Sequence, residues 1–182
     1  KKEQHYTILI ADDTQFNRDF LRAILEDTYE IIEAVDGIQA VTILQQKDQE
    51  ISLLLLDLNM PNMDGFGVLD AMNKYGWIDS VPVIMITAEE GPGLLKRAYD
   101  LGVTDYLKRD TDVETVRRRA SNTIMLYAKQ RRLQSMVNEQ IYQKEKVNNL
   151  MISILSHIVE FRNEESGLHV LHIQTMTEIL LK

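Results

Sequence analysis

Cysteine is absent from this sequence of 182 residues, and its absence excludes several kinds of chemistry. Disulfide bonds, thiolate nucleophiles and cysteine-ligated zinc sites cannot form without it. Proline and glycine are scarce, with 3 and 8 residues, and neither occurs between residues 112 and 163. Because these two residues are the strongest breakers of regular structure, their absence from so long a stretch predicts one continuous helix.

An excess of basic residues and long apolar runs are missing as well. The net charge is −8, which argues against a general affinity for nucleic-acid phosphates or anionic membrane surfaces. No apolar run approaches the roughly 20 residues that a membrane helix needs, and the start of the chain lacks the apolar segment of a signal peptide. We therefore expect a cytoplasmic protein that binds neither nucleic acid nor membranes.

The two ends of the chain lack features that usually mark the ends of a protein. The sequence begins at Lys1 without an initiator methionine, and it stops at Lys182 inside an amphipathic pattern with no helix cap. We therefore expect it to be an excerpt of a longer protein.

What the sequence does contain is a regular alternation of two kinds of segment. Apolar runs that predict strands lie at 6–11, 30–34, 51–56, 81–86 and 103–107. Segments that predict helices lie between them, at about 15–27, 37–47, 65–75 and 92–100. Strands joined by short helical crossovers form a parallel sheet with helices on both faces. The predicted fold class is therefore α/β, a five-stranded doubly wound parallel sheet followed by a long α-helical extension.

Three aspartates stand where two of the strand-forming runs stop. Asp12 and Asp13 follow the run 7–11, and Asp57 follows the run 51–56. The carboxyl ends of parallel strands border the crevice in which open α/β sheets bind ligands. One aspartate at a strand end is usually a turn former or helix cap, but three gathered carboxylates repel one another. A divalent cation or phosphoryl chemistry is the expected reason for keeping them together.

Polar residues that suit phosphoryl transfer follow the same strand ends. Thr87 ends the fourth predicted strand, Lys108 ends the fifth, and Asn59 lies two residues beyond Asp57. A carboxylate that attacks a phosphoryl group needs a hard cation with oxygen ligands to offset the negative charge. The three aspartates and the backbone carbonyl of Asn59 are candidates for holding that cation. Lys108 supplies a positive charge for phosphoryl oxygens, and Thr87 supplies a hydroxyl donor.

Five stretches of the chain resemble the response-regulator receiver domains of two-component signalling. They are Ile10-Ala11-Asp12-Asp13, residues 33–37, residues 57–65, Ile86-Thr87-Ala88 and Asp105-Tyr106-Leu107-Lys108. The resemblance covers residues 5 to about 127, and the stretch 57–65 is its most specific part. It implies a flavodoxin-like sheet with the strand order 2-1-3-4-5.

The resemblance also assigns roles in a phosphorelay. It implies that Asp57 accepts a phosphoryl group from a sensor histidine kinase or phosphotransfer protein, with Mg²⁺ held by Asp12 and Asp13. It implies that Thr87 is the switch hydroxyl and that Tyr106 is the aromatic side chain whose rotamer reports phosphorylation. Lys108 matches the lysine of the family's active site.

One residue departs from the pattern of the family. The family usually follows its lysine with a proline in a cis peptide, and this chain has Arg109 instead. A cis bond before a residue other than proline costs about 2.5–4 kcal/mol. The sequence does not decide whether the Lys108–Arg109 peptide is trans or keeps a strained cis form.

The helix predicted for 112–163 carries an apolar stripe in its later part. The stripe consists of Leu126, Leu133, Val137, Val147, Met151, Ile154, Ile158 and Phe161, and polar residues Gln130, Gln140 and Lys144 interrupt it. Its alternating steps of three and four are the heptad pattern of a coiled coil. We predict a parallel homodimer through this helix. An antiparallel hairpin folding back on itself is the alternative, and the lack of turn residues disfavours it.

The end of the chain resembles the opening of HD-GYP domains, which are metal-dependent cyclic di-GMP phosphodiesterases. Glu165 and His169 lie four residues apart and match metal ligands of that family, whose complete domain would hold iron or another transition metal. The match covers only about 30 residues, and the His-Asp pair and Gly-Tyr-Pro motif are absent. This excerpt therefore has too few ligands for turnover, although its parent would be a phosphodiesterase. His157 and His172 are interpreted as ordinary helix residues.

The sequence therefore predicts three parts. They are a receiver core at 5–111 with its last helix beginning near 112, a signalling helix at 112–163, and a truncated output domain at 164–182. Three other classes are disfavoured or left open. A phosphohydrolase usually spaces its two carboxylates by one residue, unlike Asp12 and Asp13, and a nucleotide or flavin binder would place a glycine-rich turn after the first strand. A phosphorylation-dependent scaffold or adaptor that dimerises through the long helix remains an alternative.

Overall fold

The computed structural model describes residues 6–88, 91–162, 176–177 and 179–180. The chain divides into two compact units, Lys1–Gln130 and Arg131–Lys182. The first unit contains an α/β domain, and the second contains the later part of a long helix. Glu165, His169 and His172, named above from the sequence, lie outside the described residues.

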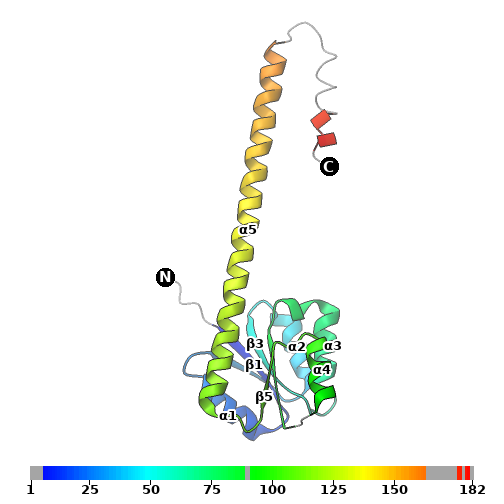
Figure 1. Cartoon of the computed structure of the whole chain (residues 1–182), viewed down its shortest axis with the longest axis vertical. Coiled ribbons are helices and arrows are strands. Elements are labelled where there is room, and N and C mark those ends of the chain that lie inside the picture. Colours follow the sequence, from blue (N-terminus) through cyan, green and yellow to red (C-terminus); the bar gives the residue numbers. More distant parts are fainter. Residues whose placement is uncertain (1–5, 89–90, 163–175, 178, 181–182) are drawn as a thin grey trace. The chain divides into compact units, whose positions relative to one another are not determined.

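Five parallel strands form the centre of the first unit (Figure 1). They are β1 (Thr7–Ala11), β2 (Glu30–Ala34), β3 (Ile51–Asp57), β4 (Val83–Thr87) and β5 (Asp105–Lys108). Their order in the sheet is β2-β1-β3-β4-β5, which confirms the predicted fold class and strand order. Every residue of the central strand β3 is buried, as expected for a parallel sheet covered on both faces.

Helices cover both faces of this sheet, as Figure 1 shows. They are α1 (Gln15–Leu25), α2 (Gly37–Lys47), α3 (Gly65–Tyr75), α4 (Pro92–Asp100) and the first part of α5 (Val113–Arg162), with a short 3₁₀ helix η1 at Trp77–Asp79. Successive strand residues point to opposite faces. Leu9 therefore packs in the cluster beneath α2, α3 and α4, whereas Ile8 and Ile10 pack in the cluster beneath α1 and α5.

Aspartate side chains cap three of the helices at their N-termini. Asp36 accepts a hydrogen bond from the backbone of Gln39 at the start of α2, and Asp64 accepts one from Gly67 at the start of α3. The backbone N–H of Thr115 donates to Asp112 at the start of α5. Each cap satisfies a backbone donor that the first helical turn leaves unpaired. The cap at Asp112 agrees with the prediction that the long helix begins near residue 112.

The long helix α5 is continuous over its 50 residues, so the antiparallel hairpin considered from the sequence is wrong. In the first unit its side chains Val116, Ala120 and Ile124 are buried against the sheet. In the second unit the predicted stripe is exposed at Leu133, Val137, Val147, Met151, Ile154 and Ile158. No helix in the described part of the chain is long and apolar enough to span a membrane.

Candidate functional site: an acidic pocket at the carboxyl edge of the sheet

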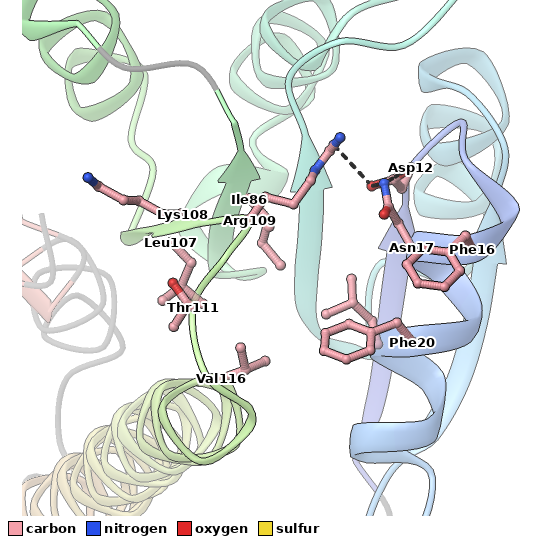
Figure 2. Close-up of a pocket in the computed structure, with 11 residues that line it drawn as sticks. Asp12, Phe16, Asn17, Phe20, Ile86, Leu107, Lys108, Arg109, Thr111 and Val116 are labelled. Carbon is pink, nitrogen blue, oxygen red and sulfur yellow. Dashed lines mark hydrogen bonds and ion pairs between the residues drawn. The ribbon is translucent and has the colours of Figure 1, made fainter.

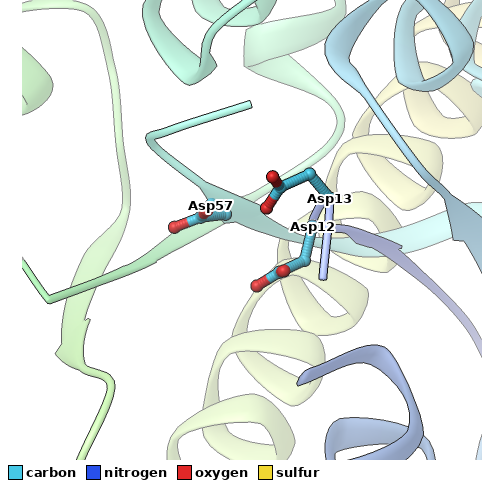
Figure 3. Close-up of side chains that lie close together, drawn as sticks. All are labelled: Asp12, Asp13 and Asp57. Atoms are coloured by element: carbon cyan, nitrogen blue, oxygen red, sulfur yellow. The ribbon is translucent and has the colours of Figure 1, made fainter. Parts of the chain in front are cut away.

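The three aspartates singled out in the sequence converge at the carboxyl ends of β1 and β3 (Figure 3). One carboxylate oxygen from each of Asp12, Asp13 and Asp57 lies within 4.8 Å of the others. Asp12 and Asp57 are buried, whereas Asp13 is exposed. An oxygen-rich cluster of this size is compatible with Mg²⁺, which prefers carboxylate and carbonyl ligands and keeps several waters.

The loop between β1 and α1 holds Asp12 in a defined orientation. Its Oδ1 accepts hydrogen bonds from the backbone N–H of Thr14 at 2.8 Å and from Nδ2 of Asn17 at 3.0 Å. Below the carboxylate, the buried Arg18 donates from Nη1 to the backbone carbonyl of Asp12 at 2.8 Å. Arg18 is itself paired with Glu33 on β2 at 3.2 Å. These contacts fix the orientation of the Asp12 carboxylate and of the backbone that carries it.

Arg109 brings a positive charge directly onto the buried carboxylates. Its Nη2 lies 2.7 Å from Oδ1 of Asp57 and 3.4 Å from Oδ2 of Asp12. Figure 2 shows the side chain extending from the end of β5 toward Asp12. The Lys108–Arg109 peptide is trans, since the described residues contain no cis bond. The trans alternative left open by the sequence is therefore the one observed.

The environment of Asp57 favours its neutral form. Burial, followed by the nearby Asp12 carboxylate, raises the pKa of Asp57 from 3.8 to about 6, and Arg109 opposes that rise. Among the side chains that the structure describes, Oδ1 of Asp57 is a buried oxygen without a hydrogen bond. The Nη2 of Arg109 lies 2.7 Å from this oxygen, so the contact between the two residues is a close ion pair. An unsatisfied buried oxygen beside two other carboxylates fits a cation ligand.

The other predicted site residues lie around this pocket in different ways. Thr87 is buried at the end of β4, and its Cα pairs with that of Lys108 on β5. Lys108 is exposed, and in Figure 2 its side chain points away from Asp12. Tyr106 is half-buried and packs against the core on the α2–α4 side of the sheet, while Asn59 is exposed in the loop after β3. The catalytic and switch roles of these residues stay predictions.

An apolar cavity of about 280 Å³ adjoins the acidic pocket on the side of α1 and α5. Phe16 and Phe20 of α1 line it together with Ile86 and Leu107 from the sheet (Figure 2). Asp12 and Arg109 form part of the same lining, so the cavity opens onto the carboxylate cluster.

Three polar contacts tie the beginning of α5 to the rest of the first unit. Arg119 pairs with Asp105, the first residue of β5, and Arg117 donates from Nε to the backbone carbonyl of Ile24 at 2.9 Å. Further along the helix, the hydroxyl of Tyr127 lies 3.3 Å from Oγ1 of Thr104. These contacts hold the beginning of α5 against α1 and against the start of β5, the strand that carries Tyr106 and Lys108.

Sequence reasoning missed two cations of this site. Arg109 was noted only as a departure from a family pattern, although it directly follows a strand end that had been assigned to the site. Arg18 was not singled out, because a single arginine in a helix gives no sign of burial. Its position on one helix face with Leu21 and Leu25 is the signal that could have indicated burial.

The comparison with protein families identifies the class. The sequence model of the Response regulator receiver domain family matches residues 8–121, which is more than half of the chain. The chain therefore belongs to the response regulator receiver family. Receiver domains interact with histidine kinases or phosphotransfer proteins in two-component signalling.

Individual relatives are similar over different lengths. A probable cyclic di-GMP phosphodiesterase of Vibrio cholerae is 27% identical over 181 residues, which cover 96% of this chain and 41% of that protein. The histidine-protein kinase BarA of Escherichia coli is 30% identical over 122 residues, which cover 66% of this chain and 13% of the kinase. The chain thus spans less than half the length of either relative.

A solved structure shows the same fold. The chemotaxis protein CheY4 of Vibrio cholerae is 26% identical and superposes with a TM-score of 0.61. The superposition covers 66% of this chain and 99% of that structure. The aligned share corresponds in size to the α/β unit without the later part of α5.

Proposed function

We propose that this chain is the input part of a response regulator, in which Asp57 accepts a phosphoryl group. The observation that carries the proposal is the gathering of three carboxylates within 4.8 Å, with Asp57 buried and one of its oxygens unsatisfied. The donor is a phosphorylated histidine of a kinase or phosphotransfer protein. In the transfer, an Asp57 carboxylate oxygen forms a bond to phosphorus while the bond from phosphorus to the histidine nitrogen breaks. The raised pKa of Asp57 is compatible with this role, because the group is still ionised at neutral pH.

The residues of the pocket fit a magnesium ion. Asp12, Asp13, a carboxylate oxygen of Asp57 and the backbone carbonyl of Asn59 would hold it, and all of these donors are oxygens. When bound, Mg²⁺ offsets the negative charge of the phosphoryl oxygens during transfer. The Thr87 hydroxyl would donate a hydrogen bond to an oxygen of the transferred group, and Lys108 would supply a further positive charge.

Phosphorylation at the pocket changes β5 and, through it, the first turns of α5. A hydrogen bond from Thr87 to the phosphoryl group on Asp57 draws the end of β4 toward the acidic pocket. Tyr106 changes rotamer in response. Tyr106 adjoins Asp105, which holds Arg119 of α5. A movement of β5 therefore reaches α5 through a direct polar contact. We expect α5 to have two packing arrangements, and phosphorylation of Asp57 shifts the equilibrium between them.

The output is a dimeric helix followed by a phosphodiesterase domain. The exposed heptad stripe of α5 would be buried by a second copy of the same helix, which would make so long a helix stable. The similarity to the probable cyclic di-GMP phosphodiesterase extends over 96% of this chain, beyond the receiver-family match. This supports an HD-GYP output in the full-length protein, with Glu165 and His169 among its metal ligands. Residues 5–111, 112–163 and 164–182 are then input, signalling helix and start of the output.

Phosphorylation can be tested on the chain as it stands. The protein is incubated with Mg²⁺ and a small phosphodonor such as acetyl phosphate, and its intact mass is measured. We expect the mass to rise by one phosphoryl group in the wild type and to stay constant in Asp57→Asn. The adduct should disappear at alkaline pH, as acyl phosphates do. Equal labelling of Asp57→Asn would exclude Asp57 as the acceptor, and continuous phosphate release without an adduct would indicate a hydrolase.

A further inference from the structure

The guanidinium of Arg109 occupies the space between the two buried carboxylates of the acidic pocket. Its Nη2 lies 2.7 Å from Asp57 and 3.4 Å from Asp12. The two carboxylate side chains are only 2% and 4% exposed, whereas that of Arg109 is 38% exposed. Arg109 thus reaches into the pocket from a partly solvated position, and its charge offsets the repulsion between the carboxylates.

This contact is made by charge more than by fitted hydrogen bonds. Arg109 donates one long hydrogen bond to Asp12 at 3.4 Å, and the Asp57 oxygen beside it receives none. A guanidinium frequently binds a carboxylate through two parallel N–H bonds, which add geometric specificity to the ion pair. Arg119 contacts Asp105 in the same domain more fully, because its Nη1 donates to both carboxylate oxygens, at 2.8 and 2.7 Å. Arg109 thus makes fewer fitted hydrogen bonds with its carboxylates than Arg119 makes with Asp105, and its partly exposed side chain has room to move out toward solvent.

A divalent ion and Arg109 would compete for the same oxygens. Mg²⁺ binds oxygen ligands at about 2.0–2.1 Å in a nearly octahedral shell that includes waters. A guanidinium nitrogen at 2.7 Å from Oδ1 of Asp57 takes up space beside that oxygen which an ion and its waters would need. The repulsion between two cations on one pair of carboxylates adds to the steric conflict.

We propose that Arg109 is a tethered counter-cation, which neutralises the pocket of the ion-free domain and must withdraw before Mg²⁺ binds. The inference rests on the proposed magnesium site. By thermodynamic linkage, Arg109 weakens Mg²⁺ binding by the same factor by which Mg²⁺ weakens the contact of Arg109. The displaced side chain belongs to the segment between β5 and α5, where the N–H of Arg109 bonds to the carbonyl of Thr87 and that of Thr111 bonds to Lys108. Ion binding is thereby communicated to the beginning of α5.

The test is a calorimetric Mg²⁺ titration of the whole chain without any phosphodonor. We expect Arg109→Gln to bind Mg²⁺ about tenfold more tightly than the wild type, within the usual range of coupling between two sites. Arg109→Lys, which keeps the positive charge as a compact ammonium without the planar guanidinium, should lie between them. Arg118→Gln is the matched control, because it removes one arginine charge from an exposed pair with Glu114. Its Mg²⁺ affinity should equal that of the wild type.

A second measurement does not depend on the affinity. Thermal unfolding in EDTA should show Arg109→Gln melting below the wild type, because its carboxylates repel without a counter-cation. Saturating Mg²⁺ should shrink or remove this difference. Mg²⁺ binding of equal or lower affinity in Arg109→Gln would overturn the inference while leaving the magnesium site intact. No Mg²⁺ binding by any variant, including the wild type, would instead overturn the proposed site itself.

Discussion

Arg119 of α5 holds Asp105 of β5 through two hydrogen bonds, at 2.8 and 2.7 Å, directly before Tyr106 in the sequence. The pair joins the root of the long helix to the strand that borders the acidic pocket. Because both side chains are partly exposed, the pair contributes little to stability but fixes a specific geometry. It is a direct polar connection to α5 from the strand that carries the proposed switch residue.

Breaking this pair should change stability only slightly. We expect Arg119→Gln and Asp105→Asn each to lower the free energy of unfolding by about 1 kcal/mol or less. A double-mutant cycle in urea should give a coupling free energy of similar size. Additive losses in the double variant would show that the two residues do not interact in solution.

Asp57 should make the ion-free domain less stable as the pH rises. Its pKa in the folded protein is about 6, above the ordinary 3.8, so folding favours the protonated form. The stabilising contribution is complete below pH 3.8 and is lost as the pH rises through 6. Integration over that interval gives up to about 3 kcal/mol.

The measurement is urea unfolding of wild type and Asp57→Asn in EDTA across this pH range. We expect the variant to be the more stable protein at pH 7.5, with the difference shrinking toward pH 4. The comparison isolates Asp57 from other carboxylates, such as Asp36, whose hydrogen bonds lower its pKa and act in the opposite sense. A difference that does not vary with pH would contradict the assigned titration.

Mg²⁺ affinity should depend on the same titration. A carboxylate must lose its proton before it can bind an ion, so the affinity should fall about tenfold for each pH unit below 6. Calorimetric titrations at pH 5 and pH 7.5 would measure the change, and the ion should release protons at the lower pH. An affinity that is constant between these values would exclude Asp57 as a ligand.

Gly65 at the start of α3 should tolerate no side chain. A Cβ built there would lie 2.6 Å from the backbone carbonyl oxygen of Asp57 and 3.0 Å from Cα of Leu58. Because both atoms belong to the backbone that positions the acceptor, Gly65→Ala should destabilise the domain by roughly 1–3 kcal/mol and slow phosphorylation. Gly93→Ala is the control, since nothing lies within 4 Å there and alanine favours the helix α4. Unfolding and labelling rates that match between the two variants would contradict the expected clash.

The heptad stripe of α5 should control self-association. Val137 lies in the stripe and is half exposed, so Val137→Lys should weaken a dimer by at least about tenfold through a buried charge. Asn138→Lys, one residue further and outside the stripe, should leave association unchanged. Analytical ultracentrifugation of the two variants and the wild type measures the difference. A wild-type chain that stays monomeric at all accessible concentrations would exclude the dimer.

Most of the fold could be predicted because its information is local in the sequence. The apolar runs, the turn residues and the lack of breakers after residue 112 indicated every strand and α-helix of the described domain to within a few residues, but not the short 3₁₀ helix η1. The three aspartates could be placed together for the same reason, since the carboxyl ends of parallel strands share one edge. The stretch 57–65 then pointed to the receiver family, which the family match confirmed.

The electrostatics of the pocket could not be predicted in the same way. Lys108 and Arg109 are adjacent basic residues, and nothing in their order says which one reaches the carboxylates. The structure directs Arg109 to Asp12 and Asp57, a contact between residues far apart in the chain. The burial of Arg18 and the raised pKa of Asp57 likewise depend on neighbours supplied by other elements.

The sequence by itself determined the elements, their order and the residues available at one edge of the sheet, because hydrophobic period and turn chemistry act over a few residues. Tertiary structure alone decided which cation neutralises Asp57, how deeply that carboxyl is buried and where α5 is attached to β5. Those properties are set by desolvation and by charges a few ångströms apart in space, and such distances exist only after the strands have assembled.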